Sequence, residues 1–192
     1  MHAESKKEKP GKLRKFTKRQ VAIVNNATAM AEEIVSNFFK ISTNEWLRRR
    51  YDVRTLAELS PEEVVLGPFA QIIRYQGHRT NVPLGSSSYD FYKIGLQDHN
   101  ILSVLKNSPE IDLFPFALYI VTHELIHIIR FSQFLQNFEA SPDEKMGEER
   151  RVHEKTHDIL KQIRIPGLEA VFDFYRHWRK PFDQFENQLE NG

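Results

Sequence analysis

The sequence predicts a single compact α+β domain that is mainly helical, with a small sheet and one buried helix. Apolar residues recur at helical spacing over most of the 192 residues. Residues 67–96 are instead rich in β-branched and aromatic side chains, which is typical of strands. A chain of this length, with 40% apolar and 28% charged residues, is long enough and apolar enough to bury one core.

The charge pattern predicts a tail before this domain. Residues 1–20 hold eight Lys or Arg against two Glu, although the net charge of the whole chain is only +1. Phe16 is the single aromatic residue among them, so the stretch lacks the interleaved rings that stack on bases, and we expect a solvated tail without a nucleic-acid partner. The domain organisation that we predict has a basic tail (1–16), one domain in two parts (17–112 with the sheet, 113–180 with the metal site) and a C-terminal tail (181–192).

The composition also limits the chemistry. The chain contains no cysteine, so any metal must be held by His and carboxylate side chains, and eight His are present. The first ten residues have no apolar segment typical of a signal peptide, and the apolar run Leu113–Val121 is shorter than the roughly 20 residues that span a bilayer. We therefore expect a cytoplasmic protein without a membrane partner. No sequence feature indicates the oligomeric state.

The first half of the domain combines helices with two strands. Thr17 and Gln20 have the spacing of a capping box, which predicts a helix from about Lys18 to Lys40. Strands are expected at Ala70–Gln76 and Tyr89–Leu96, joined by a long polar loop. Shorter helical segments are expected at Trp46–Tyr51, after Ser60–Pro61, and at Asn100–Lys106.

The second half is expected to be helical throughout. The apolar spacing around Pro115 continues to Phe138, which predicts a long central helix. Ser141, Pro142 and Glu144 combine a capping box with proline at the first helical position, and predict a helix to about Ile163. After the break at Pro166–Gly167, a last helix is expected at Leu168–Trp178.

The central helix contains the five residues His123-Glu124-Leu125-Ile126-His127, an H-E-x-x-H pattern. On a helix, residues four apart lie on one face with about 5 to 6 Å between their Cβ atoms, so the two imidazoles can share one metal ion. The surrounding segment is apolar on nearly every side, so these polar groups are buried and need partners. A bound metal ion would supply them.

The segment Ile120–His127 resembles the active helix of the zincin metallopeptidases, and the resemblance covers this helix and the one after it. It implies one Zn²⁺ per chain with His123 and His127 as ligands, and Glu124 as the general base that takes a proton from the attacking water. The resemblance thus implies a peptidase with a peptide or protein substrate. Metzincins continue after the second His with x-x-Gly-x-x-His, whereas this chain has Ile128, Ile129 and Arg130 and no nearby His. The resemblance therefore implies the gluzincin branch, with a Glu ligand from the next helix.

Three residues of that helix compete for the third ligand position. Glu149 lies about 35° from the centre of the helix's apolar stripe, nearer than Glu148 or His153, so orientation favours Glu149. The two helices are expected to be antiparallel, so residues at the same distance from the turn between them lie side by side. His153 is closer than Glu149 to the level of His123 and His127 along the helix axes, so this criterion favours His153 instead. Since Glu149 and His153 are one turn apart, one can be the ligand while the other supports it from the side.

Two other functions fit the same residues. His153-Glu154-Lys155-Thr156-His157 is a second H-E-x-x-H, and two E-x-x-H pairs are typical of ferritin-like di-iron proteins, with Glu32 or Glu33 completing the site. The other alternative is a metal-binding or interaction protein that is not catalytic.

Other parts of a peptidase site are harder to assign. Tyr119, Tyr175 and His177 are the candidates for stabilising the oxyanion of the reaction, although each fits a packing role too. The strand at Tyr89–Leu96 is the candidate edge for an extended peptide.

Overall fold

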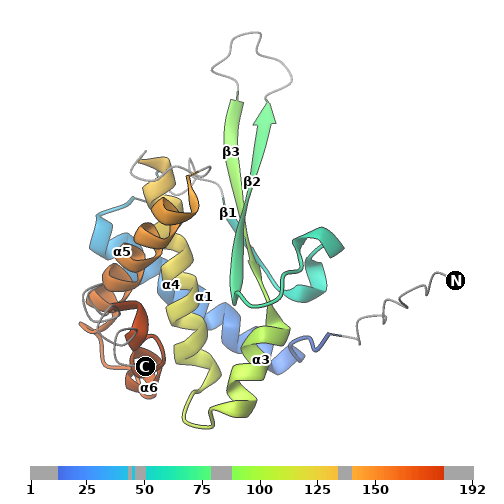
Figure 1. Cartoon of the computed structure of the whole chain (residues 1–192), viewed down its shortest axis with the longest axis vertical. Helices are drawn as coiled ribbons and strands as arrows, with labels where there is room; N and C mark the ends of the chain where they lie inside the picture. Colours follow the sequence, from blue (N-terminus) through green and yellow to red (C-terminus); the bar gives the residue numbers. More distant parts are fainter. Residues whose placement is uncertain (1–12, 43–44, 46–50, 79–87, 134–139, 180–192) are drawn as a thin grey trace, which may run out of the picture.

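The computed structural model describes residues 13–42, 45, 51–78, 88–133 and 140–179. It confirms the predicted class, a mainly helical α+β fold with a small sheet (Figure 1). The elements, in chain order, are α1 (Lys18–Phe39), β1 (Tyr51–Arg54), the 3₁₀ turns Leu56–Glu58 and Pro61–Glu63, β2 (Ala70–His78), β3 (Ser88–Leu96), α3 (Asp98–Asn107), α4 (Leu113–Ser132), α5 (Pro142–Leu160), α6 (Leu168–Phe174) and the 3₁₀ turn Arg176–Arg179.

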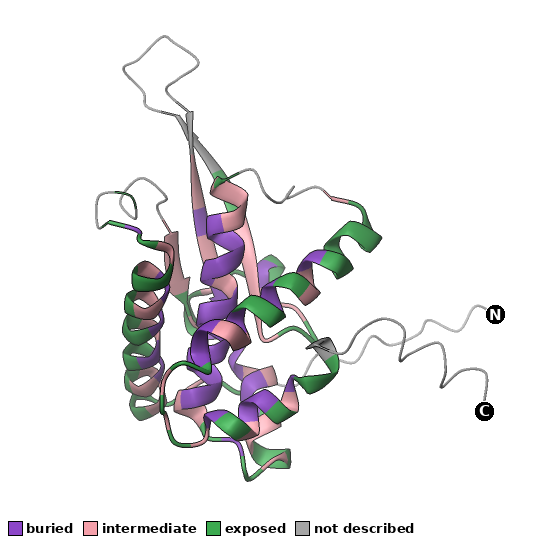
Figure 2. Cartoon of the chain, turned by 90° about the vertical axis from the view of Figure 1, so that its left-hand side faces the viewer, coloured by how far each residue is buried: buried purple, intermediate pink, exposed green. Residues whose placement is uncertain are grey.

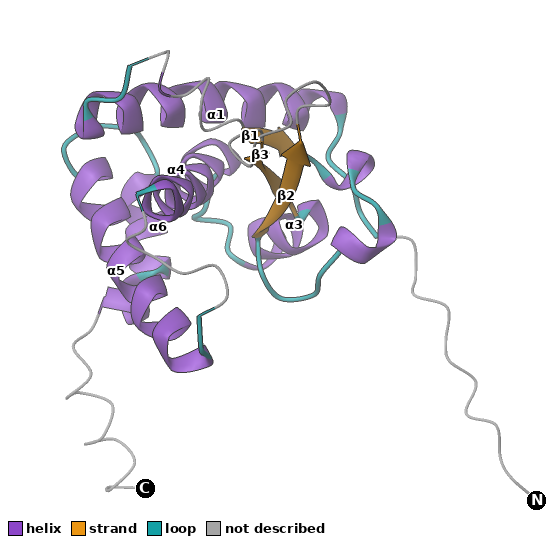
Figure 3. Ribbon diagram, turned by 90° about the horizontal axis from the view of Figure 1, so that it is seen from above, coloured by secondary structure: helices purple, strands orange, loops and turns teal. Residues whose placement is uncertain are grey.

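Helix α4 is the centre of the molecule. Fourteen of its 20 residues are buried, which agrees with a helix that is apolar on all sides (Figure 2). Seen from above, α1 lies on one side of α4, α5 on a second and the sheet on a third (Figure 3). The length and hydropathy of α4 would allow it to cross a membrane, but 78% of its most apolar window is buried inside the fold. Its apolar side chains therefore face the protein's own core.

The sheet has three strands in the order β1-β3-β2. Strands β2 and β3 pair antiparallel from Ala70↔Leu96 to His78↔Ser88, and β1 pairs parallel with β3, with Tyr51 opposite Tyr92. One face, with Tyr92, Ile94 and Leu96, is buried in the main core. On the other face, Lys93 binds the carboxylate of Glu63 at 2.6 Å and lies over the Tyr75 ring. The sheet thus packs on the helices through one side only.

The predicted helix starts are confirmed by their hydrogen bonds. Thr17 and Ser141 each accept the amide of the residue three positions on, and Gln20 and Glu144 complete the two capping boxes. Such caps satisfy amides that have no partner within the helix, so they fix where a helix begins.

Several sequence predictions need correction. β1 was not predicted, and Tyr51, expected to end a short helix, begins this strand; residues 46–50 of that helix lie outside the described residues. α4 ends at Ser132, and the predicted extension to Phe138 lies mostly outside the described residues. Residues 1–12 of the first tail, 79–87 of the loop and the whole C-terminal tail also lie outside them. α5 ends at Leu160 rather than near Ile163, and the last helix ends at Phe174 and continues as a 3₁₀ turn.

Candidate metal centre

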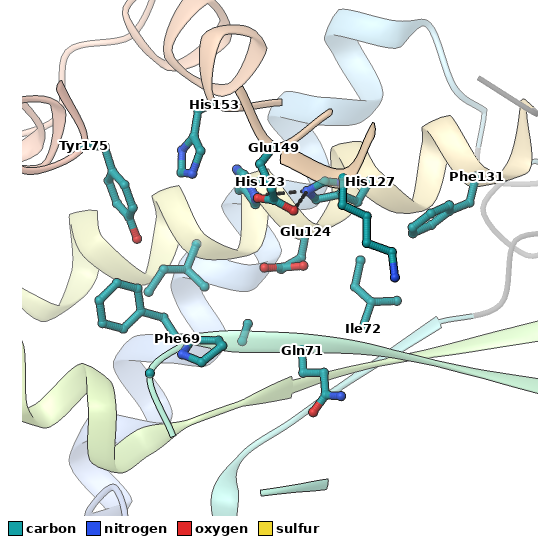
Figure 4. A pocket seen from close by; sticks show the side chains of 15 residues that line it. Phe69, Gln71, Ile72, His123, Glu124, His127, Phe131, Glu149, His153 and Tyr175 are labelled. Carbon is teal, nitrogen blue, oxygen red and sulfur yellow. Dashed lines mark hydrogen bonds and ion pairs between the residues drawn. The ribbon is translucent and has the colours of Figure 1, made fainter. Parts of the chain in front are cut away.

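Three side chains from α4 and α5 bring their potential ligand atoms together. The Nε2 atoms of His123 and His127 are 3.1 Å apart, as their spacing of one helical turn allows. The carboxylate of Glu149 lies against both, with Oε2 3.1 Å from Nε2 of His123 and Oε1 3.2 Å from Nε2 of His127 (Figure 4). Both imidazoles are buried, at 7% and 4% exposure, whereas Glu149 is partly open to solvent. Glu149, the residue that orientation on the helix favoured, thus lies against both histidines, and its role as a metal ligand stays a prediction.

His153, one turn after Glu149, also reaches this site. Its ring centre is 4.2 Å from that of His123, and its Nδ1 is 3.0 Å from the hydroxyl of Tyr119, which leaves Nε2 as its atom for the site. His123, Glu149 and His153 each offer one ligand atom within 4.8 Å of the others, so this group could hold a metal ion. Both candidates that the sequence left open thus lie at the same place.

The geometry fits a small metal ion. Around a tetrahedral ion with metal–nitrogen distances of about 2.0 to 2.1 Å, neighbouring ligand atoms are roughly 3.3 Å apart. The two Nε2 atoms are 3.1 Å apart, and each lies 3.1 or 3.2 Å from a different oxygen of Glu149, distances close to that value. Two unprotonated Nε2 atoms facing one another at 3.1 Å would repel, so either a shared proton or a cation between them is required. These residues therefore fit a metal ion with nitrogen and oxygen ligands.

The electrostatics of the site follow from burial and from the short contacts. Burial alone would raise the pKa of Glu149, but its contacts with His123 and His127 outweigh it and hold that pKa far below its usual range. Burial raises the pKa of Glu124, against the opposing charges of the two histidines. Burial, then repulsion from His123, lowers the pKa of His153 to about 2. His153 is therefore neutral at physiological pH, the form that can bind a metal.

Glu148, the neighbour of Glu149, has a structural role. Its side chain is buried and binds the guanidinium of Arg130 from α4, with a second contact of 3.2 Å to Arg151. Since a buried carboxylate needs this kind of pairing, Glu148 joins α4 to α5 beside the site rather than within it. Of the two adjacent glutamates, only Glu149 is presented to the histidines.

The second H-E-x-x-H pattern does not form a second group of this kind within the described part of the chain. Glu154 is exposed, and the ring of His157 packs edge-on against Phe172 at 4.6 Å between centroids. Of the two residues proposed to complete a di-iron site, Glu32 accepts a 2.6 Å hydrogen bond from the Tyr51 hydroxyl, and Glu33 is exposed. Only His153 of the second pattern lies at the metal centre.

A cavity of about 720 Å³ opens onto the metal centre. One wall is α4 and α5, and the other is the segment Gly67–Ile72, which leads into and begins β2 (Figure 4). Gly67 makes the turn before this wall with φ of +104°, a conformation that side chains disfavour. Glu124 points into the cavity between the metal centre and β2. This wall was not predicted from the sequence, although Gly67–Pro68 is a turn signal next to a strand.

The three candidates for stabilising an oxyanion have different positions. The hydroxyl of Tyr119 is bonded to His153, and His177 is exposed and does not line the cavity. Tyr175 lines the cavity, and its ring is stacked on that of Tyr119 at 4.2 Å with 9° between the planes. Burial, together with Tyr119 and Glu124, raises the pKa of Tyr175 well above its ordinary value. Tyr175 therefore stays protonated as a potential hydrogen-bond donor beside the site.

The strand predicted as the edge for a peptide, Tyr89–Leu96, is not an edge strand, so this prediction was wrong. β3, which contains Tyr89–Leu96, is the central strand and is paired on both sides, whereas β2 is at the edge of the described sheet.

No protein-family model, curated protein or solved structure matches this chain. The assignment of a function therefore depends on the site itself.

Proposed function

We propose that this protein is a zinc-dependent peptidase of gluzincin type, with His123, His127 and Glu149 as the zinc ligands and Glu124 as the general base. The observation that supports this most is the Glu149 carboxylate bridging the two Nε2 atoms at 3.1 and 3.2 Å, while Glu124 faces the adjacent cavity. Two nitrogens and one carboxylate, with no thiolate in the chain, form a ligand set typical of catalytic zinc.

When bound, zinc would make water more acidic and polarise a substrate carbonyl. The side chains of the protein divide the remaining work. Glu124, next to His123 in sequence but turned toward the cavity, takes a proton from the attacking water and passes it to the departing amine. The hydroxyl of Tyr175 donates a hydrogen bond to the oxygen of the former carbonyl, where negative charge develops.

His153 acts beside the ligands in this proposal. The bond between its Nδ1 and the Tyr119 hydroxyl fixes the ring against His123, and Tyr119 is in turn stacked on Tyr175. Nδ1 of His123 is buried without a hydrogen-bond partner in the described part of the chain, so its ring is oriented by this packing. The aromatic stack thus positions His123, His153 and Tyr175 together.

The test combines metal analysis with hydrolysis by matched variants. Purified wild-type protein and Glu124→Gln should both hold one zinc per chain by elemental analysis. Because a general base contributes roughly 10² to 10⁴ in rate, Glu124→Gln should lose hydrolysis of a mixed fluorogenic peptide set by about that factor. Glu154→Gln, the same change in the second H-E-x-x-H, should keep both zinc and activity, since Glu154 is exposed.

Several results would contradict the proposal. If the wild-type protein took up no zinc at neutral pH, the proposed zinc site would be excluded. If the zinc-loaded protein cleaved no peptide, the peptidase activity would be excluded, and the metal-binding alternative would be favoured. Two iron ions per chain would favour the di-iron alternative, and hydrolysis retained by Glu124→Gln would exclude Glu124 as the base.

A further inference from the structure

The strand beside the candidate metal centre, β2, has one edge with which no described strand pairs. In the sheet order β1-β3-β2, the described strands pair with β2 on one side only. The amide of Gln97 donates a 2.8 Å hydrogen bond to the carbonyl of Phe69. This bond shows which residues of β2 direct their backbone N–H and C=O groups toward β3 and which direct them away from it. In an antiparallel pair every second residue bonds the partner, so Phe69 and Gln71 face β3, and the backbone groups of Ala70 and Ile72 face the other edge. Ala70 and Ile72 both line the cavity.

This edge determines the direction of an added peptide. β2 begins next to Phe69, whose ring is 6.4 Å from that of Tyr175, and proceeds to Ile72 toward the end of the cavity where Phe131 lies (Figure 4). Antiparallel pairing is slightly more stable than parallel pairing, so a peptide would run from the Phe131 end to the Tyr175 end. Glu124 lies between the two ends. The residue that follows the cleaved bond would thus lie at the Tyr175 end.

The two ends of the cavity differ in chemistry. The Tyr175 end is apolar: Phe69 lies there, Pro68 precedes it in the chain, and Ile120 lines the cavity from α4, next in sequence to the Tyr119 that stacks on Tyr175. The rings of Phe69 and Tyr175 are also fixed by Phe116, at 5.1 and 6.1 Å, so this end is preformed. The Phe131 end is more polar, because Lys145 of α5 lines the cavity one helical turn before Glu149. The ion pair of Arg130 with Glu148 places that turn of α5 beside the Phe131 end of α4.

We propose that the site cleaves extended peptides immediately before a large apolar residue, whose side chain enters the pocket formed by Phe69, Ile120 and Tyr175. This specificity rests on the peptidase function proposed above. Apolar pockets discriminate by burial of surface, and each missing methylene changes kcat/KM by roughly 10 to 200-fold. Peptides with Leu or Phe after the cleaved bond should therefore exceed those with Ala or Asp there by at least about 10-fold.

The test is a cleavage profile measured with zinc-loaded protein on a peptide library, with cleaved bonds identified by mass spectrometry. Ile120→Ala should widen the accepted set toward larger rings, and Ile120→Phe should shift it toward small residues. Ile72→Ala, at the other end of the cavity, should change the preference before the bond but not after it. The same peptides should bind the zinc-loaded Glu124→Gln protein with the same order of affinity.

The outcomes separate this inference from the proposed function. Hydrolysis with no preference after the bond, or with a preference only before it, overturns the inference and leaves the peptidase intact. If no peptide is cleaved, the proposed function fails, and binding to Glu124→Gln still tests the pocket. About 10-fold tighter binding of the apolar peptides, reduced by Ile120→Phe, supports the pocket, and equal binding overturns it. If a variant has lower thermal stability than the wild-type protein, its data are set aside, and the cleavage profile of the wild-type protein decides whether the inference holds.

Discussion

The chain contains the same five-residue pattern twice, and the two copies have different environments. The first, at residues 123–127, is in α4, where fourteen of 20 residues are buried, and the second, at residues 153–157, is in α5, where six of 19 are buried. In the first copy both histidines and Glu124 border the cavity. In the second only His153 does, because Glu154 is exposed and His157 packs on Phe172.

The difference shows which features of the surroundings allow an H-E-x-x-H pattern to form a site. A helix that is buried on all sides brings every polar side chain to a place without bulk water, where it needs a partner. A helix with one buried stripe lets the remaining polar side chains face solvent at little cost. Both copies can place two imidazoles one turn apart, but only the environment of the first brings a carboxylate from another helix between them. Burial and a facing helix, more than spacing, separate a site from a solvated face.

Removing one histidine from each copy should produce the largest difference between the two copies. His127→Ala takes away a nitrogen that is 3.1 Å from His123 and 3.2 Å from Glu149, whereas His157→Ala removes a ring that packs on Phe172. Changes to groups that only support a ligand cost 10 to 100-fold in metal affinity, so losing a ligand should cost at least about 100-fold. Competition with a coloured zinc chelator would measure both affinities. Equal losses in the two variants would contradict the different roles of the copies.

Adjacent glutamates of α5 provide the next test. Glu149→Gln should weaken zinc binding by about 100-fold while changing the Tm of the metal-free protein little, since Glu149 is partly open to solvent. Glu148→Gln leaves Arg130 without its buried carboxylate, and should cost about 3 kcal/mol of unfolding free energy, or roughly 6 to 12 °C in Tm. Zinc titration and thermal unfolding of both variants would measure this. If Glu148→Gln lost zinc without loss of stability, the roles of the two residues would be exchanged.

Local signals in the sequence predicted much of this site. The capping boxes at Thr17 and Ser141 gave two helix starts to the residue, because a cap depends on side chains three positions apart. The apolar stripe of the helix after the cap gave the side on which Glu149 lies. Depth along the two helices favoured His153, and both residues belong to the group that could hold a metal ion, whereas the choice of the third ligand stays a prediction.

The remaining features depend on contacts between distant segments. The strand order β1-β3-β2 puts β2, and not β3, at the edge, and pairing between strands far apart in sequence is not specified by periodicity. β1 has only four residues, too few for a clear alternation. The bond of Tyr119 to His153 joins residues 34 positions apart, so a local pattern has no means of indicating it.

His153 permits a finer test, because it is the one residue of the second copy at the metal centre. In our assignment it supports the ligands, so His153→Gln should lower zinc affinity by about 10-fold, less than His127→Ala does. Tyr119→Phe keeps the ring stacked on Tyr175 but removes the partner of Nδ1, and should produce a smaller change in the same direction. Zinc affinity and kcat/KM of both variants would be compared. A loss as large as that of His127→Ala, with Glu149→Gln retaining zinc, would make His153 the third ligand.

The smallest expected effect concerns how the two helices begin. α5 has few buried residues and a complete capping box, in which the amide and hydroxyl of Ser141 both lie 2.8 Å from Oε2 of Glu144. α4 begins after Asp112, which makes no capping bond through its side chain, and most of this helix is buried, so we expect its stability to depend less on a cap. Ser141→Ala should therefore cost about 1 kcal/mol at pH 7, and Asp112→Ala less than about 0.5 kcal/mol.

This last difference should also depend on pH. The bonds from the amide and hydroxyl of Ser141 lower the pKa of Glu144, so their stabilising effect is complete above the ordinary glutamate pKa and is lost as the pH falls below it. The gap in Tm between wild-type protein and Ser141→Ala should then be constant from pH 6 to 8 and narrow in acid. Thermal unfolding at a series of pH values would measure it. A gap for Asp112→Ala as large as that for Ser141→Ala would mean that α4 depends on a local cap as much as α5 does, and that burial alone does not explain the first copy.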